Sequence, residues 1–263
     1  MNSIIPDREY EFEILTFEYK ILGGLNMFVT ISLIFIIVGI LQFLIILLDI
    51  FKNPQRQMMI MNIVWPLTGL YFPILGLIAY YRLGKEKEVD HMSNQHDHYH
   101  DTMHHHEHHS NKPFWKSVVV STTHCSAGCS FGDLIGAPVV FFTGLLFFNN
   151  QMVTEFIIEF ILAYIFGLMF QYFHMEIKHD HPGRDLVDAI KADTLSLIAF
   201  EIGMFGFMII MHLFVSPTYM QPNHVEYWFL MQIAMLIGFM TSYPINWYLV
   251  KKGIKHAMQI LSY

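Results

Sequence analysis

The sequence predicts an all-α, polytopic helical membrane protein with six transmembrane helices. Its composition is 54% hydrophobic and only 14% charged, with a mean hydropathy of +0.41, whereas an ordinary soluble domain is roughly 25% charged. Long apolar runs also reach the roughly 20 residues that cross a ~30 Å hydrocarbon core. These runs occupy about residues 25–50, 58–81, 115–148, 153–175, 194–215 and 227–250. Both observations exclude a soluble globular domain.

The apolar runs divide the chain into four segments. Residues 1–22 are acidic and aromatic, without the basic start and cleavage site of a signal peptide, and are expected to be cytoplasmic. Residues 23–81 hold the first two spans, 82–112 a disordered cytoplasmic loop and 113–258 the last four spans. Two cysteines are too few for a disulfide-built extracellular fold. The net charge of -7 is spread over the loops and predicts no nucleic-acid partner.

The distribution of Lys and Arg predicts the orientation, because cytoplasmic loops are enriched in both residues. With six spans and the N-terminus inside, only Lys52 and Arg56 fall outside, and the remainder of the 15 basic residues fall inside. We therefore expect both the N-terminus and the C-terminus to be cytoplasmic.

The third span is longer than a bilayer requires, because the run from Trp115 to Phe148 would make ~51 Å of helix. Two glycines and Pro138 lie near residues 132–138. We expect the helix to be broken or unwound there, where the freed backbone lines a cavity or binds an ion. A long, tilted helix with a proline kink is the alternative.

A group of potential metal ligands lies in the first half of this span, where residues 123–133 read THCSAGCSFGD. Cys125, Cys129 and Asp133 follow an i, i+4, i+8 spacing and share one helical face, with His124 about 100° away. Thiolate and imidazole bind soft or borderline metals, above all Cu(I) and Zn(II). The alternative is that these cysteines are small buried hydrophobic residues and that the neighbouring glycines pack helices.

Other ionisable residues lie within the predicted spans, where such groups are functional candidates. Glu201 is expected at the depth of Cys125, so that it joins His124, Cys125 and Cys129 in a central tier. An outer tier would contain Asp133, Glu155, Glu159 and His212, and an inner tier Asp193, His174, His179 and His181. Three such tiers predict a path for a cation or a proton. Alternatively, each acid pairs with a hydroxyl, amide or Tyr of a neighbouring helix.

The loop between the second and third predicted spans is rich in histidine. Residues 91–111 hold nine of the 16 histidines and too few apolar residues to fold. His-rich tracts bind metal, which predicts a cytoplasmic metal buffer. Its predicted ligands are His96, His98, His100, His104, His105, His106, His108 and His109. Low-complexity drift in a tolerant loop is the alternative.

Four stretches resemble a family of prokaryotic multi-spanning membrane proteins known only as a domain of unknown function. They are NPQRQMMIMNIVWPLTGLY (53–71), WKSVVVSTTHCSAGCSFGDLIG (115–136), IKADTLSLIAFEIGMFG (190–206) and MQIAMLIGFMTSYPINWYLVKKGIKHAM (231–258). The resemblance covers about residues 25–258. It implies a protein of the prokaryotic cell membrane with an H-C-x-x-G-C signature, carried here by His124, Cys125, Gly128 and Cys129. It implies no activity.

These observations predict a membrane protein that binds and transports a transition-metal cation, copper or zinc, through a central His/Cys/Glu site. No nucleotide-binding motif of the form G-x-x-x-x-G-K-[ST] is present, so no nucleotide cofactor is expected and transport would run on gradients. The expected partners are the lipid bilayer, the metal ion and further membrane subunits in a homo-oligomer or larger complex. One alternative is a membrane thiol oxidoreductase that uses Cys125 and Cys129. The other is a non-transporting accessory or sensor subunit.

Overall fold

The computed structural model describes residues 8–55, 59–85, 113–174, 182–215 and 217–255, and these ranges contain seven α-helices and no strand. The all-α class is therefore confirmed. The elements are α1 (Arg8–Lys52), α2 (Met61–Tyr71), α3 (Leu75–Ala79), the π-helical turn η1 (Tyr80–Gly84), α4 (Phe114–Thr143), α5 (Gln151–His174), α6 (Pro182–Phe214), the 3₁₀ turn η2 (Pro217–Met220) and α7 (Val225–Lys251).

Five of the described helices are long and apolar enough to cross a membrane. Their spanning segments are Asn26–Lys52, Phe114–Thr143, Gln151–Phe170, Asp193–Phe214 and Val225–Lys251. The predicted count of six is not confirmed, because the run at 58–81 does not form one helix. A backbone turn separates α2 from α3, where Pro73 removes an amide donor and Ile74 has a φ of 70°.

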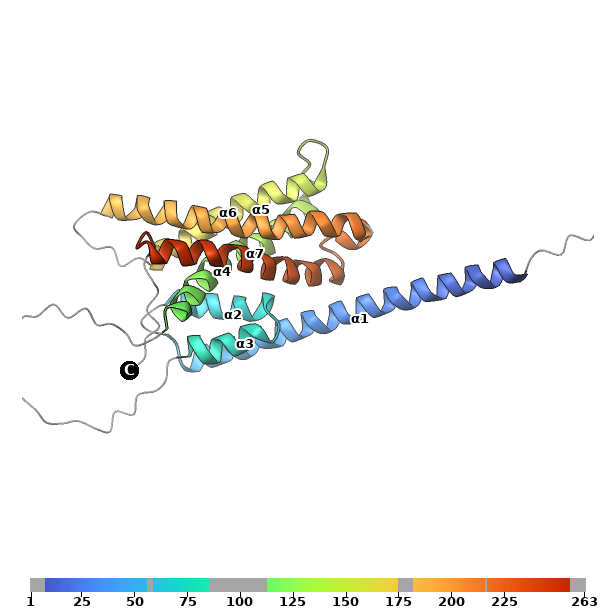
Figure 1. Cartoon of the computed structure of the whole chain (residues 1–263), viewed down its shortest axis with the longest axis horizontal. Coiled ribbons are helices and arrows are strands. Elements are labelled where there is room, and N and C mark those ends of the chain that lie inside the picture. Colours follow the sequence, from blue (N-terminus) through green and yellow to red (C-terminus); the bar gives the residue numbers. More distant parts are fainter. Residues whose placement is uncertain (1–7, 56–58, 86–112, 175–181, 216, 256–263) are drawn as a thin grey trace, which may run out of the picture.

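The two arms of this segment lie antiparallel as a helical hairpin. The Trp65 and Tyr80 rings are 5.9 Å apart, and a Cβ on Gly76 would lie 2.6 Å from the carbonyl oxygen of Thr68. Figure 1 shows α2 and α3 side by side next to α1. The hairpin therefore enters and leaves the bundle at the same end.

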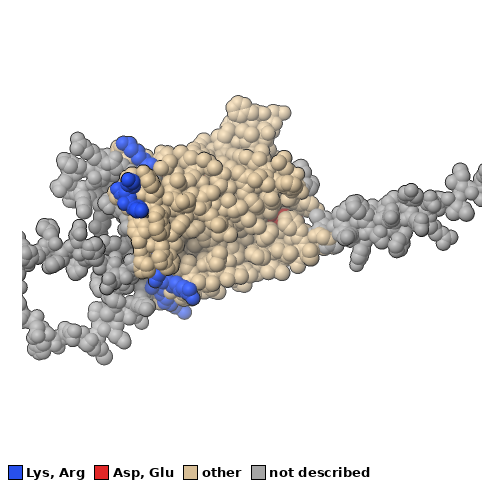
Figure 2. All heavy atoms as spheres, in the orientation of Figure 1, with Lys and Arg blue, Asp and Glu red and all other residues tan. Residues whose placement is uncertain are grey.

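The ends of α1 and of the hairpin are joined by polar contacts. Lys85 Nζ lies 3.0 Å from Asp49 Oδ2, and the Tyr80 hydroxyl donates to the same carboxylate at 2.8 Å. Asp49 is less than one helical turn from Lys52, so Lys52 and Lys85 lie at one end of the molecule. The expectation that they face opposite sides is wrong. In Figure 2 the visible Lys and Arg side chains gather at this end, which we call the basic end.

Close glycine contacts hold α4 against α5. Added Cβ atoms on Gly128 and Gly132 would lie 2.8 Å from Gly167 Cα and 2.3 Å from Ala163 N. This pairing shows that the two helices run antiparallel, with their backbones close together, as small residues allow in membranes. Helix α4 is also the most enclosed of the helices long enough to span a membrane. In its most apolar 18-residue stretch 61% of the residues are buried, compared with 22–33% in the other four helices.

Helices α6 and α7 form a second antiparallel pair. The Thr241 hydroxyl donates to the carbonyl of Ala199 at 2.7 Å, and a Cβ on Gly203 would meet the Thr241 side chain. Residues of α4 contact both helices of this pair and also α2. Helix α4 is thus the centre of the bundle.

Helix α4 is continuous through residues 132–138, so the expected break is absent. Pro138 lies inside the helix, which ends at Thr143 because Gly144 adopts the left-handed conformation with a φ of 65°. The glycines that suggested an unwound turn serve instead for close packing against α5. Residues 144–148 fall in the connection to α5 rather than in the span.

Candidate functional site

Helix α4 places both cysteines near the middle of the bundle. Cys125 and Cys129 follow its first residue, Phe114, by about 17 and 23 Å, in a helix of 30 residues. Both thiols are free of disulfides and buried. Their one-turn spacing places them on the same helical face. The two sulfur atoms are therefore available as a pair, away from bulk water.

Glu201 of α6 lies beside this thiol pair. Its carboxyl group interacts with the Cys129 thiol and is within electrostatic range of Cys125. The side chain is only 2% exposed, and neither carboxyl oxygen has a well-formed hydrogen bond to a described residue. Buried polar groups almost always have a partner, so this carboxyl group is unusual for a structural residue. The sequence placed Glu201 at the depth of Cys125, and the structure brings the two residues together.

His124 is buried next to the thiol pair but faces a different part of the bundle. It is 2% exposed, and its ring centroid is 6.3 Å from that of Phe170 on α5. It therefore packs toward α5. The spacing analysis, which put His124 about 100° from the cysteines, agrees with this placement.

Three further carboxyl groups continue from Glu201 toward the end opposite to the basic end. Asp133 is fully buried, lacks a hydrogen-bond partner among the described residues, and is within electrostatic range of Glu201 and Glu159. Glu159 packs against Gly136 and accepts a 3.4 Å hydrogen bond from the Tyr227 hydroxyl. Glu155, one turn further, accepts a 3.0 Å hydrogen bond from Gln151.

A cluster that includes an ion pair lies on the other side of the thiols, at the basic end. Lys255 Nζ is 2.7 Å from Asp193 Oδ1 and donates to Asn246 Oδ1 at 2.9 Å, and the Ser196 hydroxyl donates to the same Asn246 oxygen at 3.0 Å. All four residues are buried. Burial lowers the pKa of Lys255, but the Asp193 carboxylate outweighs this effect and raises the pKa above its ordinary value.

Each of these groups is within electrostatic range of the next, and we call the set the polar series: Glu155, Glu159, Asp133, Glu201, Cys129, Cys125, Asp193 and Lys255. Asp193 and Lys255 are within electrostatic range of Cys125, which links the basic end to the thiols. The hydroxyl oxygens of Ser121, Ser126 and Ser130 on α4 are also buried without a hydrogen-bond partner among the described residues. The interior of the bundle therefore has polar groups that water or a cation would satisfy.

The remaining predicted site residues do not join the polar series. His212 is partly exposed near the end of α6. His174 ends α5, and its side chain lies outside the described residues, as do His179, His181 and every predicted ligand of the 91–111 loop. Within the described ranges, no three His, Cys, Asp or Glu side chains are grouped closely enough to hold a metal ion.

Sequence reasoning missed three residues that the fold brings to the polar series. Tyr71, at the end of α2, is within electrostatic range of both thiols, and Lys255 and Asn246 build the cluster at the basic end. A polar residue inside the sixth predicted span was a usable signal for Asn246. Nothing in the sequence pairs Lys255 with Asp193, because 62 positions separate them.

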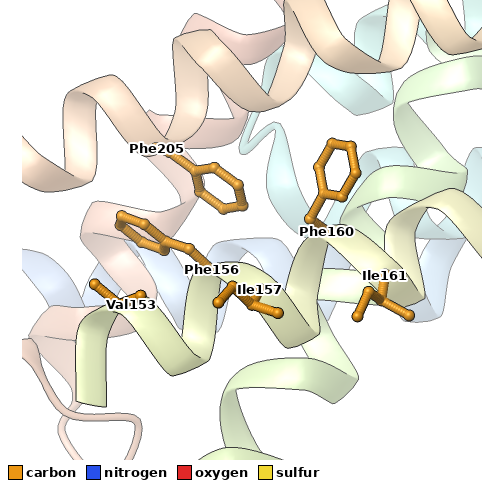
Figure 3. A pocket seen from close by; sticks show the side chains of 6 residues that line it. All are labelled: Val153, Phe156, Ile157, Phe160, Ile161 and Phe205. Carbon is orange, nitrogen blue, oxygen red and sulfur yellow. The ribbon is translucent and has the colours of Figure 1, made fainter. Parts of the chain in front are cut away.

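A shallow groove on the surface of the bundle is apolar and separate from the polar series. Its volume is about 340 Å³, and the rings of Phe156 and Phe205 stack across it with centroids 4.3 Å apart (Figure 3). It is lined by Val153, Phe156, Ile157, Phe160, Ile161 and Phe205. These side chains suit contact with lipid and offer no ligand to an ion.

The fold and its interior define a class of polytopic α-helical proteins that have spanning-length helices around a buried series of acids and thiols. The chain belongs to the family described as Domain of unknown function (DUF4396), whose sequence profile matches residues 114–255, just over half of the chain. The match covers α4 to α7 and the whole polar series, and leaves out α1 and the hairpin. No curated protein and no solved structure matches the chain.

Proposed function

We propose that this protein binds a transition-metal cation and moves it across a membrane through the α4–α7 bundle. The observation that carries the proposal is the polar series, which extends from Glu155 to Lys255 inside the bundle. Ionisable groups at this depth are unfavourable unless they interact with one another or with an ion. A single structural hydrogen bond would not require so many of them.

The thiol pair is the proposed central binding site. Thiolates favour soft metals, and the neighbouring Glu201 supplies a carboxylate that can release the ion. A structural zinc site needs four ligands, whereas Cu(I) is stable with two sulfur ligands. Since the two thiols share one helical face and no third His, Cys, Asp or Glu side chain of the described residues lies close enough to complete a site, copper fits better than zinc. In the H-C-x-x-G-C pattern, Gly128 lets α5 pack closely against α4. The same turn of α4 therefore carries both the proposed ligands and the residue that permits this contact.

The basic end is the proposed cytoplasmic side, because Lys and Arg gather on cytoplasmic loops. With five spanning helices, the N-terminus then lies on the opposite side and the C-terminus in the cytoplasm. Residues 85 and 113 both lie at the basic end, so the histidine-rich loop between them would face the cytoplasm and buffer metal. The chain has no nucleotide-binding motif of the Walker type, and an ion gradient would drive transport.

Elemental analysis of the purified protein in detergent tests the central site. We compare a variant lacking residues 91–111 with the same loop-deleted chain carrying Cys125→Ser/Cys129→Ser or Thr122→Ala, a buried control on α4 whose hydroxyl bonds to the carbonyl of Val118. We expect close to one copper per chain in the loop deletion with or without Thr122→Ala, and none with the double serine substitution. Loss of metal from the loop deletion alone would contradict a metal site at the cysteines.

Flux into proteoliposomes then separates transport from the other two interpretations. A transporter accumulates copper inside the vesicles, whereas a sensor or accessory subunit binds the metal without moving it. A disulfide between Cys125 and Cys129, found by mass spectrometry of oxidised protein without any metal flux, would favour the thiol oxidoreductase.

A further inference from the structure

The ammonium group of Lys255 lies inside the bundle rather than in solvent. It is held by Asp193 Oδ1 at 2.7 Å and Asn246 Oδ1 at 2.9 Å, and the side chain is only 4% exposed. Lysine is almost never this deeply buried, and Lys251 and Lys252, just before it, are exposed. The contacts of Lys255 therefore need an explanation beyond ordinary surface charge.

The backbone after α7 directs this side chain inward. Gly253 has a φ of 69°, which is a conformation that favours glycine. The amides of Ile254 and Lys255 then bond back to the carbonyl of Leu249 at 3.0 and 3.3 Å. The turn folds the chain back onto the end of α7, and Lys255 enters the space between α6 and α7.

The groups that receive the ammonium would also suit a free ion. Asp193 supplies one negative charge and Asn246 supplies a neutral oxygen that is fixed by the Ser196 hydroxyl. Oxygen ligands prefer hard cations, and a single carboxylate balances one positive charge. We propose that Asp193, Asn246 and Ser196 form a binding site for a small monovalent cation, ammonium or an alkali-metal ion, and that Lys255 is its tethered occupant.

This site lies at the basic end of the polar series, within electrostatic range of Cys125. The ammonium of Lys255 therefore competes with a cation that travels between the thiols and this end of the bundle. This competition with a travelling cation rests on the proposed function. The binding of a monovalent cation at the site is independent of that function, because it is inferred only from the cluster of Lys255, Asp193, Asn246 and Ser196.

Thermal unfolding of the full chain in detergent provides the first test. We expect Lys255→Ala to unfold at a lower temperature than the native protein. Sodium, potassium or ammonium chloride should restore more of the lost unfolding temperature than choline chloride at the same concentration. Choline is too large for the site and controls for ionic strength. Lys252→Ala, an exposed neighbour, should gain less over choline than Lys255→Ala does, because Lys255 still competes for the site. Lys255→Ala/Asp193→Asn should respond equally to all four salts. An equal response of Lys255→Ala to choline would overturn the proposal.

Chemical labelling of the native protein provides a test that needs no variant. Sodium or potassium ions should displace the Lys255 ammonium and increase its acetylation severalfold relative to Lys252, as measured by mass spectrometry. Acetylation that depends only on ionic strength, with choline as effective as sodium, would refute cation binding. Neither test uses a transition metal, so failure of copper flux would disprove the proposed function without touching this result.

Discussion

At the scale of one residue, Glu201 is the deeply buried acid to which the proposed function gives a role. Its carboxyl group is enclosed beside Cys129 and has no well-formed hydrogen bond to a described residue. A second buried acid, Glu226, is only 2% exposed but lies at the start of α7, where His224 Nδ1 is 3.9 Å away. The two acids are equally hidden from solvent and differ in whether they face the polar series. They form a matched pair for mutation.

We expect Glu201→Gln to reduce copper flux in proteoliposomes by ~10-fold or more, because a contact to a charged group is worth ~1.5–3 kcal/mol and 1.4 kcal/mol is a factor of ten. The melting temperature should stay the same or rise, since the substitution replaces a buried ionisable group with a neutral group of the same size. Glu226→Gln should leave flux within about twofold. Equal losses in both variants would show that Glu201 acts only through folding.

At the scale of elements, glycines bring the backbones of α4 and α5 together, and the Phe131 ring of α4 adds contacts to Phe166 and Phe170 of α5. Gly132 faces Ala163 so closely that an added Cβ would lie 2.3 Å from a backbone nitrogen. Backbone atoms cannot rotate away, so the helices would have to separate. Gly206 of α6 differs, because no atom lies within 4 Å of an added Cβ.

Gly132→Ala should therefore lower stability by ~1–3 kcal/mol, the usual range for overpacking. Gly206→Ala should leave it unchanged or raise it by ~0.5–1 kcal/mol through helix propensity. Thermal unfolding in one detergent measures both. If Gly132→Ala were as stable as the native protein, this result would contradict the close approach of α4 and α5 at Gly132.

The hairpin of α2 and α3 is the element that makes the arrangement differ from the six spans predicted from the sequence. Its sequence is apolar over enough residues to cross a membrane, which is why it was predicted as a span. Pro73 and the turn at Ile74 allow the chain to reverse, and Asp49 then holds Lys85 near the end of α1. Carbonyls freed at the turn are partly satisfied, since the Leu70 oxygen accepts from Gln232 of α7.

At the scale of the whole molecule, the number of spans decides which residues share a side. With five spans and a hairpin, Lys52 and Lys85 lie at the basic end and the α4–α5 connection at the other. Six spans would separate the two lysines by the thickness of the bilayer.

Cysteine accessibility in oriented vesicles tests this arrangement. In a Cys125→Ser/Cys129→Ser background, Lys52→Cys and Lys85→Cys should react with a membrane-impermeant maleimide from the same side. Asn149→Cys, in the exposed α4–α5 connection, should react from the opposite side and serves as the reference. Labelling of Lys52→Cys and Lys85→Cys from different sides would contradict the hairpin and show that residues 58–81 cross the membrane as a sixth span.

The sequence by itself determined the helical class, most of the spanning-length helices and the position of the cysteines along α4, because hydropathy and the rise per residue are local properties. Only the tertiary structure decided that residues 61–84 form a hairpin, that α4 is unbroken and that Lys255 pairs with Asp193. An apolar run has the same composition whether it crosses the bilayer or turns back within the bundle. Its path depends on contacts between residues far apart in the chain, such as Asp49 and Lys85, and these contacts exist only in the folded protein.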